Sequence, residues 1–247
     1  MKALIFDKMF LNEKSSYGLE DYSFIFTNSK NELFAIMDNF FYDLNSHFEI
    51  TNSYPIESDI YPDFYYYCAF KNLLIGYCEN ELYYMRPKIL SFSPFCSMYH
   101  KEPVASRKRK QDKICISYDQ KQNHIYISDK KENIVKKYKY GQPNPTIIEQ
   151  NIASPQSIYF QKDILWIFSQ AENSLIARDR KKILKTFNFS KEHIIKASFF
   201  INNYFYYYKN NKLNQFSLES LRRTGEKPID FIPKNIFQYK EDIVIYG

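Results

Sequence analysis

Glycine is scarce in this chain. Only five glycines occur among 247 residues, at positions 18, 76, 141, 225 and 247. A loop that cradles phosphate needs several closely spaced glycines, so the chain contains neither a P-loop nor a GxGxxG turn. The GxSxG and HExxH signatures are absent too. These absences exclude the enzyme classes that such motifs define.

Long apolar runs are also missing. No segment approaches the roughly 18 apolar residues that cross a bilayer as a helix. The opening residues, MKALIFDKMFLNEK, hold a short apolar patch that Asp7 and Lys8 interrupt, and no small-residue cleavage site follows it. We therefore expect no membrane association and no secretion, and a cytoplasmic protein, or a nuclear one in a eukaryotic cell.

Cysteine and histidine form no ligand pattern. Cys68, Cys78, Cys96 and Cys115 make no CxxC pair, and no histidine lies at zinc-finger spacing from them. In an intracellular protein such thiols are usually reduced and buried. The four histidines, His47, His100, His124 and His193, are far apart and lie outside the expected first strands of the repeats described below. We expect no metal and no cofactor.

Aromatic residues are abundant instead. The chain has 23 Tyr and 22 Phe but one Trp, and aromatics make up 19% of the residues. Tyr and Phe suit half-buried pleated surfaces, so this bias favours β-structure. The net charge of +6 is mild for a chain of this length and permits an acidic partner without demanding one.

One pattern occurs five times. Each copy is an apolar strand, a polar turn and a second strand that opens on Leu or Ile. The copies are DYSFIFTNSKNELFAI from Asp21, NLLIGYCENELYYM from Asn72, NHIYISDKKENIVKKY from Asn123, DILWIFSQAENSLIARD from Asp163 and NYFYYYKNNKLNQFS from Asn203. An asparagine occupies each turn, at Asn31, Asn80, Asn133, Asn173 and Asn211. Asparagine tolerates left-handed backbone, which suits a hairpin.

The copies repeat about every 40 residues. Those at 123, 163 and 203 are 40 residues apart, and the gaps from 21 to 72 and from 72 to 123 are both 51. A further strand precedes most hairpins, as in KICISYD from Lys113, and a fourth follows, as in KILSF from Lys88 and PTIIE from Pro145. Four short strands per repeat with almost no helical periodicity predict an all-β fold, a β-propeller of four-stranded blades.

The two ends of the chain complete this scheme. The final segment, KNIFQYKEDIVIYG, supplies the first two strands of a last blade, and KALIFD at residues 2–7 supplies the third. Pairing the N-terminal strand with the C-terminal blade would close a single domain over residues 1–247 with about six blades. Residues 7–21 are barely long enough for the two further strands required there, so five blades or an irregular first blade remain alternatives.

One copy resembles a known repeat. HIYISDKKENIVKKY resembles an NHL-type repeat, in which the second strand ends in Asp before a turn and an Asn opens the third strand. The resemblance is loose in the other copies. It extends only distantly to WD40 repeats, whose WD dipeptide and GH pair are absent. It implies the propeller fold, which hosts both scaffolds and enzymes.

The aromatic clusters FYYYCAF at residues 64–70 and YFYYYK at residues 204–209 are interpreted as core, because a blade is packed on both faces. Stacking of bases or sugars is the alternative. Paired carboxylates for hydrolysis are restricted to Asp63 and Asp119, which strand direction places at opposite ends of a central channel. We therefore predict no catalytic residues.

Two insertions, at about residues 43–62 and 93–112, interrupt the repeat, and up-and-down topology places both on one face. The second contains six basic and two acidic residues within residues 100–113. Loops carry function more often than the scaffold does, so we predict a binding surface for a partner or for phosphate there. Its residues would be Arg107, Lys108, Arg109, Lys110, Tyr54, Ile56 and Tyr61.

These features favour a non-catalytic interaction scaffold, a subunit of a larger protein assembly. The alternatives are a six-bladed lactonase-like or lyase-like enzyme with a site in the channel, or nucleic-acid binding through the basic loop. A sugar-binding propeller rests only on exposed Tyr. A small-molecule ligand is not expected.

Overall fold

In the computed structural model the described part of the chain is all-β and contains 24 strands. The structure describes residues 1–7, 13–20, 22–58, 62, 64–68, 72–78, 81–87, 89–95, 114–119, 121–139, 142, 144–190, 192 and 194–247. Within these ranges there is no helix that is long and apolar enough to cross a membrane.

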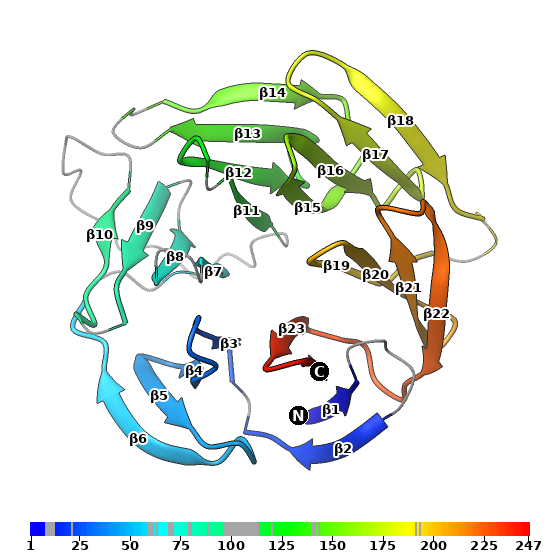
Figure 1. Ribbon diagram of the computed structural model, residues 1–247. Helices are drawn as coiled ribbons and strands as arrows, with labels where there is room; N and C mark the ends of the chain where they lie inside the picture. Colours follow the sequence, from blue (N-terminus) through cyan, green and yellow to red (C-terminus); the bar gives the residue numbers. More distant parts are fainter. Residues whose placement is uncertain are drawn as a thin grey trace. The chain divides into compact units, whose positions relative to one another are not determined.

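The strands form six four-stranded antiparallel sheets, each the blade of a six-bladed β-propeller (Figure 1). This confirms the fold predicted from the repeat. By its contacts the chain divides into two compact units of three blades each, Met1–Ile56 with Glu192–Gly247, and Glu57–Lys191. The single domain over residues 1–247 stays a prediction.

The first unit contains three sheets. One consists of β3 (Phe24–Thr27), β4 (Leu33–Met37), β5 (Phe40–Leu44) and β6 (Ile50–Pro55). The next consists of β19 (Ala197–Ile201), β20 (Tyr204–Lys209), β21 (Lys212–Ser217) and β22 (Arg222–Pro228). The third consists of β23 (Asn235–Tyr239), β24 (Asp242–Tyr246), β1 (Lys2–Phe6) and β2 (Glu13–Gly18).

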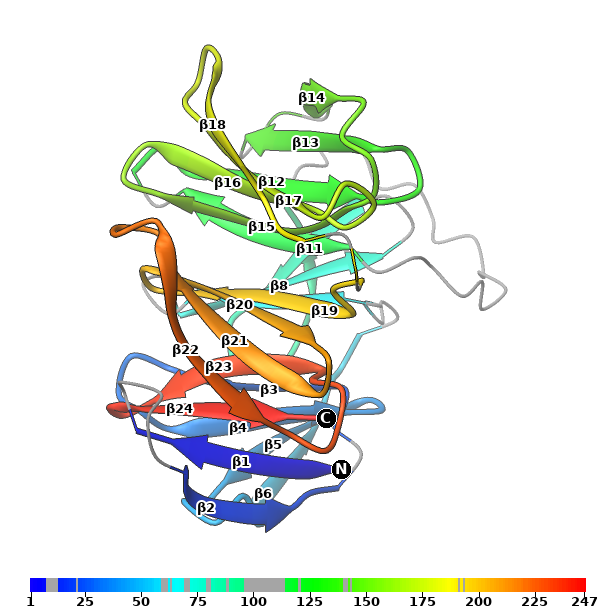
Figure 2. The same ribbon diagram turned by 90° about the vertical axis from the view of Figure 1, so that its right-hand side faces the viewer.

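The third of these sheets joins the two ends of the chain, as predicted (Figures 1 and 2). Leu4 pairs with Ile245 and Ile5 with Val244 in antiparallel register. Lys2 and Gly247 extend the ladder by exchanging backbone hydrogen bonds of 2.9 and 3.1 Å. Residues 13–18 provide the fourth strand, so the six-blade count stands and the five-blade alternative is wrong.

The first blade corrects one prediction. The copy from Asp21 was expected to supply second and third strands, but it supplies the first and second, β3 and β4. The presumed insertion at 43–62 therefore contains the fourth strand, β6. Successive antiparallel hairpins of a blade share the same alternation of apolar and polar residues and the same turn residues. The sequence pattern therefore does not show which hairpin contains the first strand of the blade. Second strands now begin 40, 51, 40, 40 and 38 residues apart, so one long spacing remains.

The second unit contains the other three sheets. Its strands are β7 (Phe64–Cys68), β8 (Leu73–Cys78), β9 (Glu81–Met85) and β10 (Ser93–Pro94), then β11 (Cys115–Asp119), β12 (His124–Asp129), β13 (Ile134–Lys139) and β14 (Thr146–Gln150), then β15 (Pro155–Gln161), β16 (Ile164–Ser169), β17 (Ser174–Arg178) and β18 (Ile183–Asn188). The fourth strand of the first of these sheets lies at Ser93–Pro94, not at the expected KILSF. Most of the insertion at 93–112 lies outside the described residues.

The turns confirm the role predicted for asparagine. Asn31, Asn133, Asn173 and Asn211 all have left-handed backbone, with φ between 55° and 60°. Asn80 lies outside the described residues. An Asp often opens these turns: one carboxylate oxygen of Asp119, and likewise of Asp129, accepts the backbone N–H groups two and three residues later.

Aromatic residues fill the core. Phe205, Tyr206, Tyr207 and Tyr208 are buried, which confirms the core interpretation of the second aromatic cluster. In the first cluster Tyr65, Tyr66 and Tyr67 are half-buried. Burial raises the pKa of Tyr66 and Tyr206 far above the usual value for tyrosine.

Candidate functional site

Of the seven residues predicted for binding, the structure describes only Tyr54 and Ile56. Arg107, Lys108, Arg109, Lys110 and Tyr61 lie outside the described residues. Tyr54 lies on β6 and is 38% exposed, whereas Ile56 is only 6% exposed and belongs to the core. The backbone N–H of Ile56 donates to the carbonyl of Asn39 at 2.8 Å. The surface role of Ile56 is therefore wrong, because the chain returns to the core as soon as the strand ends.

The edge strand β6 is the clearest exposed feature of the first unit. All six residues, ITNSYP, are exposed and none is charged. Ile50 is 44% exposed, and Phe40 on the neighbouring β5, which sequence analysis missed, is 41% exposed. Only β5 pairs with β6, so the other side of its backbone has no strand neighbour within the sheet. An uncharged strand edge is a template for pairing with another chain.

The side chains beside this edge are held in place by hydrogen bonds. Asp43 Oδ2 accepts from the Tyr54 hydroxyl at 3.1 Å and from Asn52 Nδ2 at 3.2 Å. The hydrogen bond to Asp43 raises the pKa of Tyr54. At the start of the strand, Glu49 Oε2 accepts from Asn45 Nδ2 at 2.7 Å. Two carboxylates thus lie next to an uncharged strand, which favours a partner segment with basic residues.

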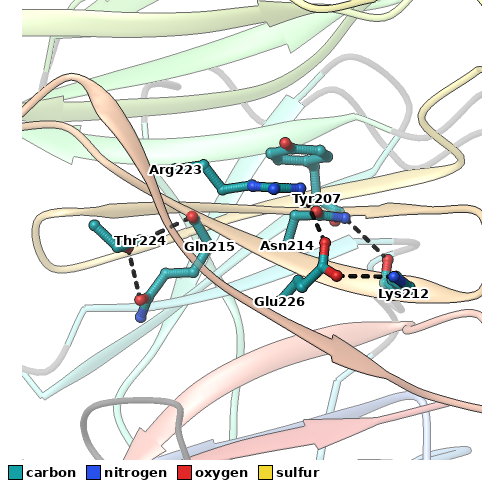
Figure 3. Close-up of polar contacts among 7 residues, drawn as sticks. All are labelled: Tyr207, Lys212, Asn214, Gln215, Arg223, Thr224 and Glu226. Atoms are coloured by element: carbon teal, nitrogen blue, oxygen red, sulfur yellow. Dashed lines mark hydrogen bonds and ion pairs between the residues drawn. The ribbon is translucent and has the colours of Figure 1, made fainter.

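The edge strand β22 is charged, in contrast to β6 (Figure 3). Its sequence, RRTGEKP, carries four charged residues. Glu226 accepts from Lys212 Nζ at 2.8 Å and from Arg223 Nη1 at 2.9 Å. The hydrogen bond from Lys212 lowers the pKa of Glu226. Charges of this kind discourage strand pairing, so β22 is protected where β6 is not.

The buried polar groups of the same blade are structural. Gln215 donates from Nε2 to the Tyr206 hydroxyl at 2.7 Å. Its amide oxygen accepts from Thr224 Oγ1 at 2.8 Å (Figure 3). Asn214 Nδ2 lies 3.3 Å from the Lys212 carbonyl. Both the nitrogen and the oxygen of the Gln215 amide have hydrogen-bond partners within the sheet. We therefore interpret Gln215 as a structural residue that holds β22 on β21, and not as a ligand-binding residue.

Of the histidines and carboxylates considered for catalysis or metal binding, the structure describes His47, His124 and Asp119. His124 opens β12 as expected, and His47 lies in the β5–β6 turn with its ring 6.0 Å from that of Tyr17. His100, His193 and Asp63 lie outside the described residues. Among the residues that are described, no three His, Cys, Asp or Glu side chains gather closely enough to hold a metal. Asp119 ends β11, where one of its oxygens holds the following turn.

Comparisons with known proteins establish the fold and no more. No protein-family model and no curated protein matches the chain. A chain of the nidogen/laminin complex aligns with a TM-score of 0.63 and 10% identity, covering 92% of this chain and 93% of that one. BBS1N in complex with ARL6DN aligns with a TM-score of 0.57 and 10% identity, covering 95% and 81%.

An enzyme candidate has the same fold. A candidate 6-phosphogluconolactonase from Bacteroides uniformis aligns with a TM-score of 0.56 and 13% identity, covering 96% of this chain and 85% of that one. The architecture is thus shared by components of protein complexes and by a candidate enzyme. Function must be argued from the residues, because a fold of this kind hosts both.

Proposed function

We propose that this β-propeller is a non-catalytic interaction scaffold, a subunit of a larger assembly, which captures a protein partner by strand addition at β6. The observation that carries the proposal is the uncharged edge strand Ile50–Pro55, all six residues of which are exposed. In strand addition, backbone hydrogen bonds supply affinity and alternating side chains supply specificity. Structures of two other propellers named as complexes support protein as the partner class.

The geometry defines what the partner must bring. Six residues extend about 20 Å, enough for one short added strand. Tyr54 lies opposite Phe41 in register and Ile50 lies opposite Leu44, so these two exposed side chains lie on different faces of the blade. A partner strand would therefore contact Tyr54 on one face and Ile50 on the other. Asp43 and Glu49, which lie beside β6, favour basic residues in that partner strand.

Lysines placed on the edge test the proposal. The double variant Ile50→Lys/Ser53→Lys adds the protection that β22 already has, without touching the hydrogen bonds to Asp43. The matched control is Thr186→Lys/Asn188→Lys on the exposed edge strand β18. Both proteins should melt within a few degrees of the wild type, because exposed substitutions typically change stability by no more than about 0.5 kcal/mol.

Partner capture from the source cells, followed by cross-linking mass spectrometry, is the readout. The wild type and the control should capture the same partner, with cross-links from it to residues next to β6. The β6 variant should lose that partner. Capture that survives the two lysines, or cross-links that fall elsewhere, would contradict strand addition at this edge. Deletion of residues 101–112 separately tests the basic loop.

An enzymatic function has one supporting observation. Burial and then Lys137 lower the pKa of His124, which favours the neutral form of the imidazole. A neutral imidazole can act as a general base. Lactone hydrolysis by the wild type that disappears in His124→Gln would favour this candidate over the scaffold.

A further inference from the structure

A small pocket lies in the second unit, independent of the β6 edge. It opens between the sheet β11–β14 and the sheet β15–β18, with a volume of about 80 Å³, room for about two or three water molecules. Its polar lining consists of Gln122, His124, Tyr126, Lys137, Arg178 and Arg180, together with Asp179. These residues come from three strands, β12, β13 and β17, and from two turns, so no sequence motif predicts the pocket.

The pocket is the polar end of an apolar interface. Tyr126 pairs with Lys137 across β12 and β13, and Leu165 pairs with Arg178 across β16 and β17. Paired residues share one face of a sheet, so these side chains lie on the two faces that pack together. Farther along the same faces, Val135 and Ile176 are buried in the core. Lys137 and Arg178 thus occupy core-facing positions where the apolar packing ends.

One wall of the pocket is aromatic and rigid. The rings of Tyr126 and Phe160 stack with centroids 5.2 Å apart and planes 13° apart. The backbone N–H of Phe160 donates to Ser117 Oγ at 2.9 Å, which ties β15 to β11. The wall is therefore formed before any ligand arrives, which reduces the entropy lost on binding.

Arg178 is a buried cation with unused hydrogen-bonding capacity. The residue is 8% exposed, and Nε lies 2.6 Å from Glu149 Oε1. The Nε–H is not directed at that oxygen, however, and has no hydrogen-bond partner among the described residues. The contact with Glu149 is therefore electrostatic, and the guanidinium group retains donors for another acceptor.

Lys137 is the second cation of the pocket. It is half-buried, and none of the ion pairs among described residues includes it. Arg180, in contrast, is held by Asp163 at 3.1 Å and by the Gln122 amide oxygen, which lies 2.6 and 2.7 Å from Nη1 and Nη2 when the amide is oriented to accept. Asp179 directs one oxygen to the backbone N–H groups of its own turn.

We propose that this pocket binds a phosphate group, either as free phosphate or as the phosphoryl group of a small aromatic ester. Lys137 and Arg178 supply the charge, and the Tyr126 hydroxyl and His124 supply further donors from the β12 side. A carboxylate has two oxygens, whereas donors from both sheets are better satisfied by the three or four oxygens of a phosphate. The Tyr126–Phe160 wall would contact the ring of the ester.

His124 reports on occupancy of the pocket. The charged groups that act on it are Asp119 on β11, Lys137 and Lys139 on β13, and Arg180 after β17. A bound dianion stabilises the imidazolium form, so phosphate should raise the pKa of His124. The titration is followed by NMR, with His124→Gln assigning the signal.

Titration of the full-length protein with inorganic phosphate, phenyl phosphate and benzoate tests the site. The two phosphates should saturate the His124 shift, and benzoate should bind at least about tenfold more weakly. Lys137→Met should weaken phosphate binding at least about tenfold. Lys131→Met, an exposed lysine in the turn at the other end of the β12–β13 hairpin, is the matched control and should leave binding unchanged. Tighter binding by phenyl phosphate than by phosphate would identify the ester as the source.

Glu149→Gln separates binding from a structural role. It removes the carboxylate beside Arg178 and should tighten phosphate binding, which no loss of packing would do. The site is overturned if phosphate leaves the His124 signal unmoved, if benzoate binds as tightly as phenyl phosphate, or if Lys137→Met binds phosphate like the wild type. If Lys137→Met does not fold, Lys137→Arg, which keeps the charge, must retain binding.

Discussion

Replacing Tyr246 by Phe tests how the last strand is held in the first unit. Tyr246 is 1% exposed, and its hydroxyl accepts the backbone N–H of Ile25 at 3.0 Å. The side chain of Asn235 also hydrogen-bonds this hydroxyl. The phenyl ring fills the same space, so the change removes hydrogen bonds and leaves the buried Ile25 N–H unpaired. An unpaired buried donor costs about 1–3 kcal/mol.

This cost can be measured in two ways. For a chain of this length, about 1–3 kcal/mol corresponds to a melting temperature lower by roughly 2–12 °C. Because the two units need not unfold together, amide hydrogen exchange of Ile25 provides the local readout and should become faster in the variant. Tyr239→Phe, on the neighbouring strand and only half-buried, is the control and should have little effect. Unchanged stability together with unchanged exchange at Ile25 would refute the inference that this hydrogen bond holds β3 to the terminal blade.

Three further predictions concern the stability of the fold. Gly76→Ala should destabilise by about 1–3 kcal/mol in urea unfolding, because a Cβ there would lie 2.2 Å from Pro62 Cγ; a neutral result would show that Pro62 moves aside. Asn133→Ala should lower the free energy of unfolding by about 1–2 kcal/mol, because alanine disfavours the left-handed backbone at φ 56°. The loss of the hydrogen bond that Asn133 Oδ1 accepts from the backbone N–H of Ser154 should lower it further. Asn133→Gly should lose only the hydrogen bond, because glycine tolerates this backbone conformation. Burial raises the pKa of Tyr126 and Tyr159 to about 12, against about 10 in the unfolded chain. Their contribution to the free energy of unfolding is therefore complete below a pH of about 10 and is lost as the pH rises through about 12. Urea midpoints that stay constant over that interval would contradict this.

The architecture could be predicted from local patterns. Alternation of apolar residues marks a strand, asparagine in a turn marks a hairpin, and a repeat of about 40 residues marks a blade. The joining of the two ends followed from the need of a terminal strand such as Asp242–Tyr246 for a neighbour on both sides. Each of these inferences depends on residues that are close in sequence or on a rule that any sheet must obey.

The numbering of strands in the first blade could not be predicted. Phe24–Thr27 and Leu33–Met37 form a hairpin that looks like every second-to-third hairpin in the chain. Nothing local distinguishes a first strand from a second, because both are apolar and both end in a turn with asparagine. Because the strands of this blade were numbered incorrectly, the segment that contains the fourth strand β6 was predicted to be an inserted loop.

The residues of the β6 edge and those of the phosphate pocket could be recognised only in the tertiary structure. The sequence alone determined an all-β propeller of about six blades, with its ends in a shared sheet, because strand periodicity and turn chemistry are local properties. Only the tertiary structure decided that β6 is an exposed edge, that Ile56 is core, and that Lys137 and Arg178 face one pocket from different blades. Side chains some 40 residues apart meet through strand register and blade packing, and no local pattern encodes that meeting.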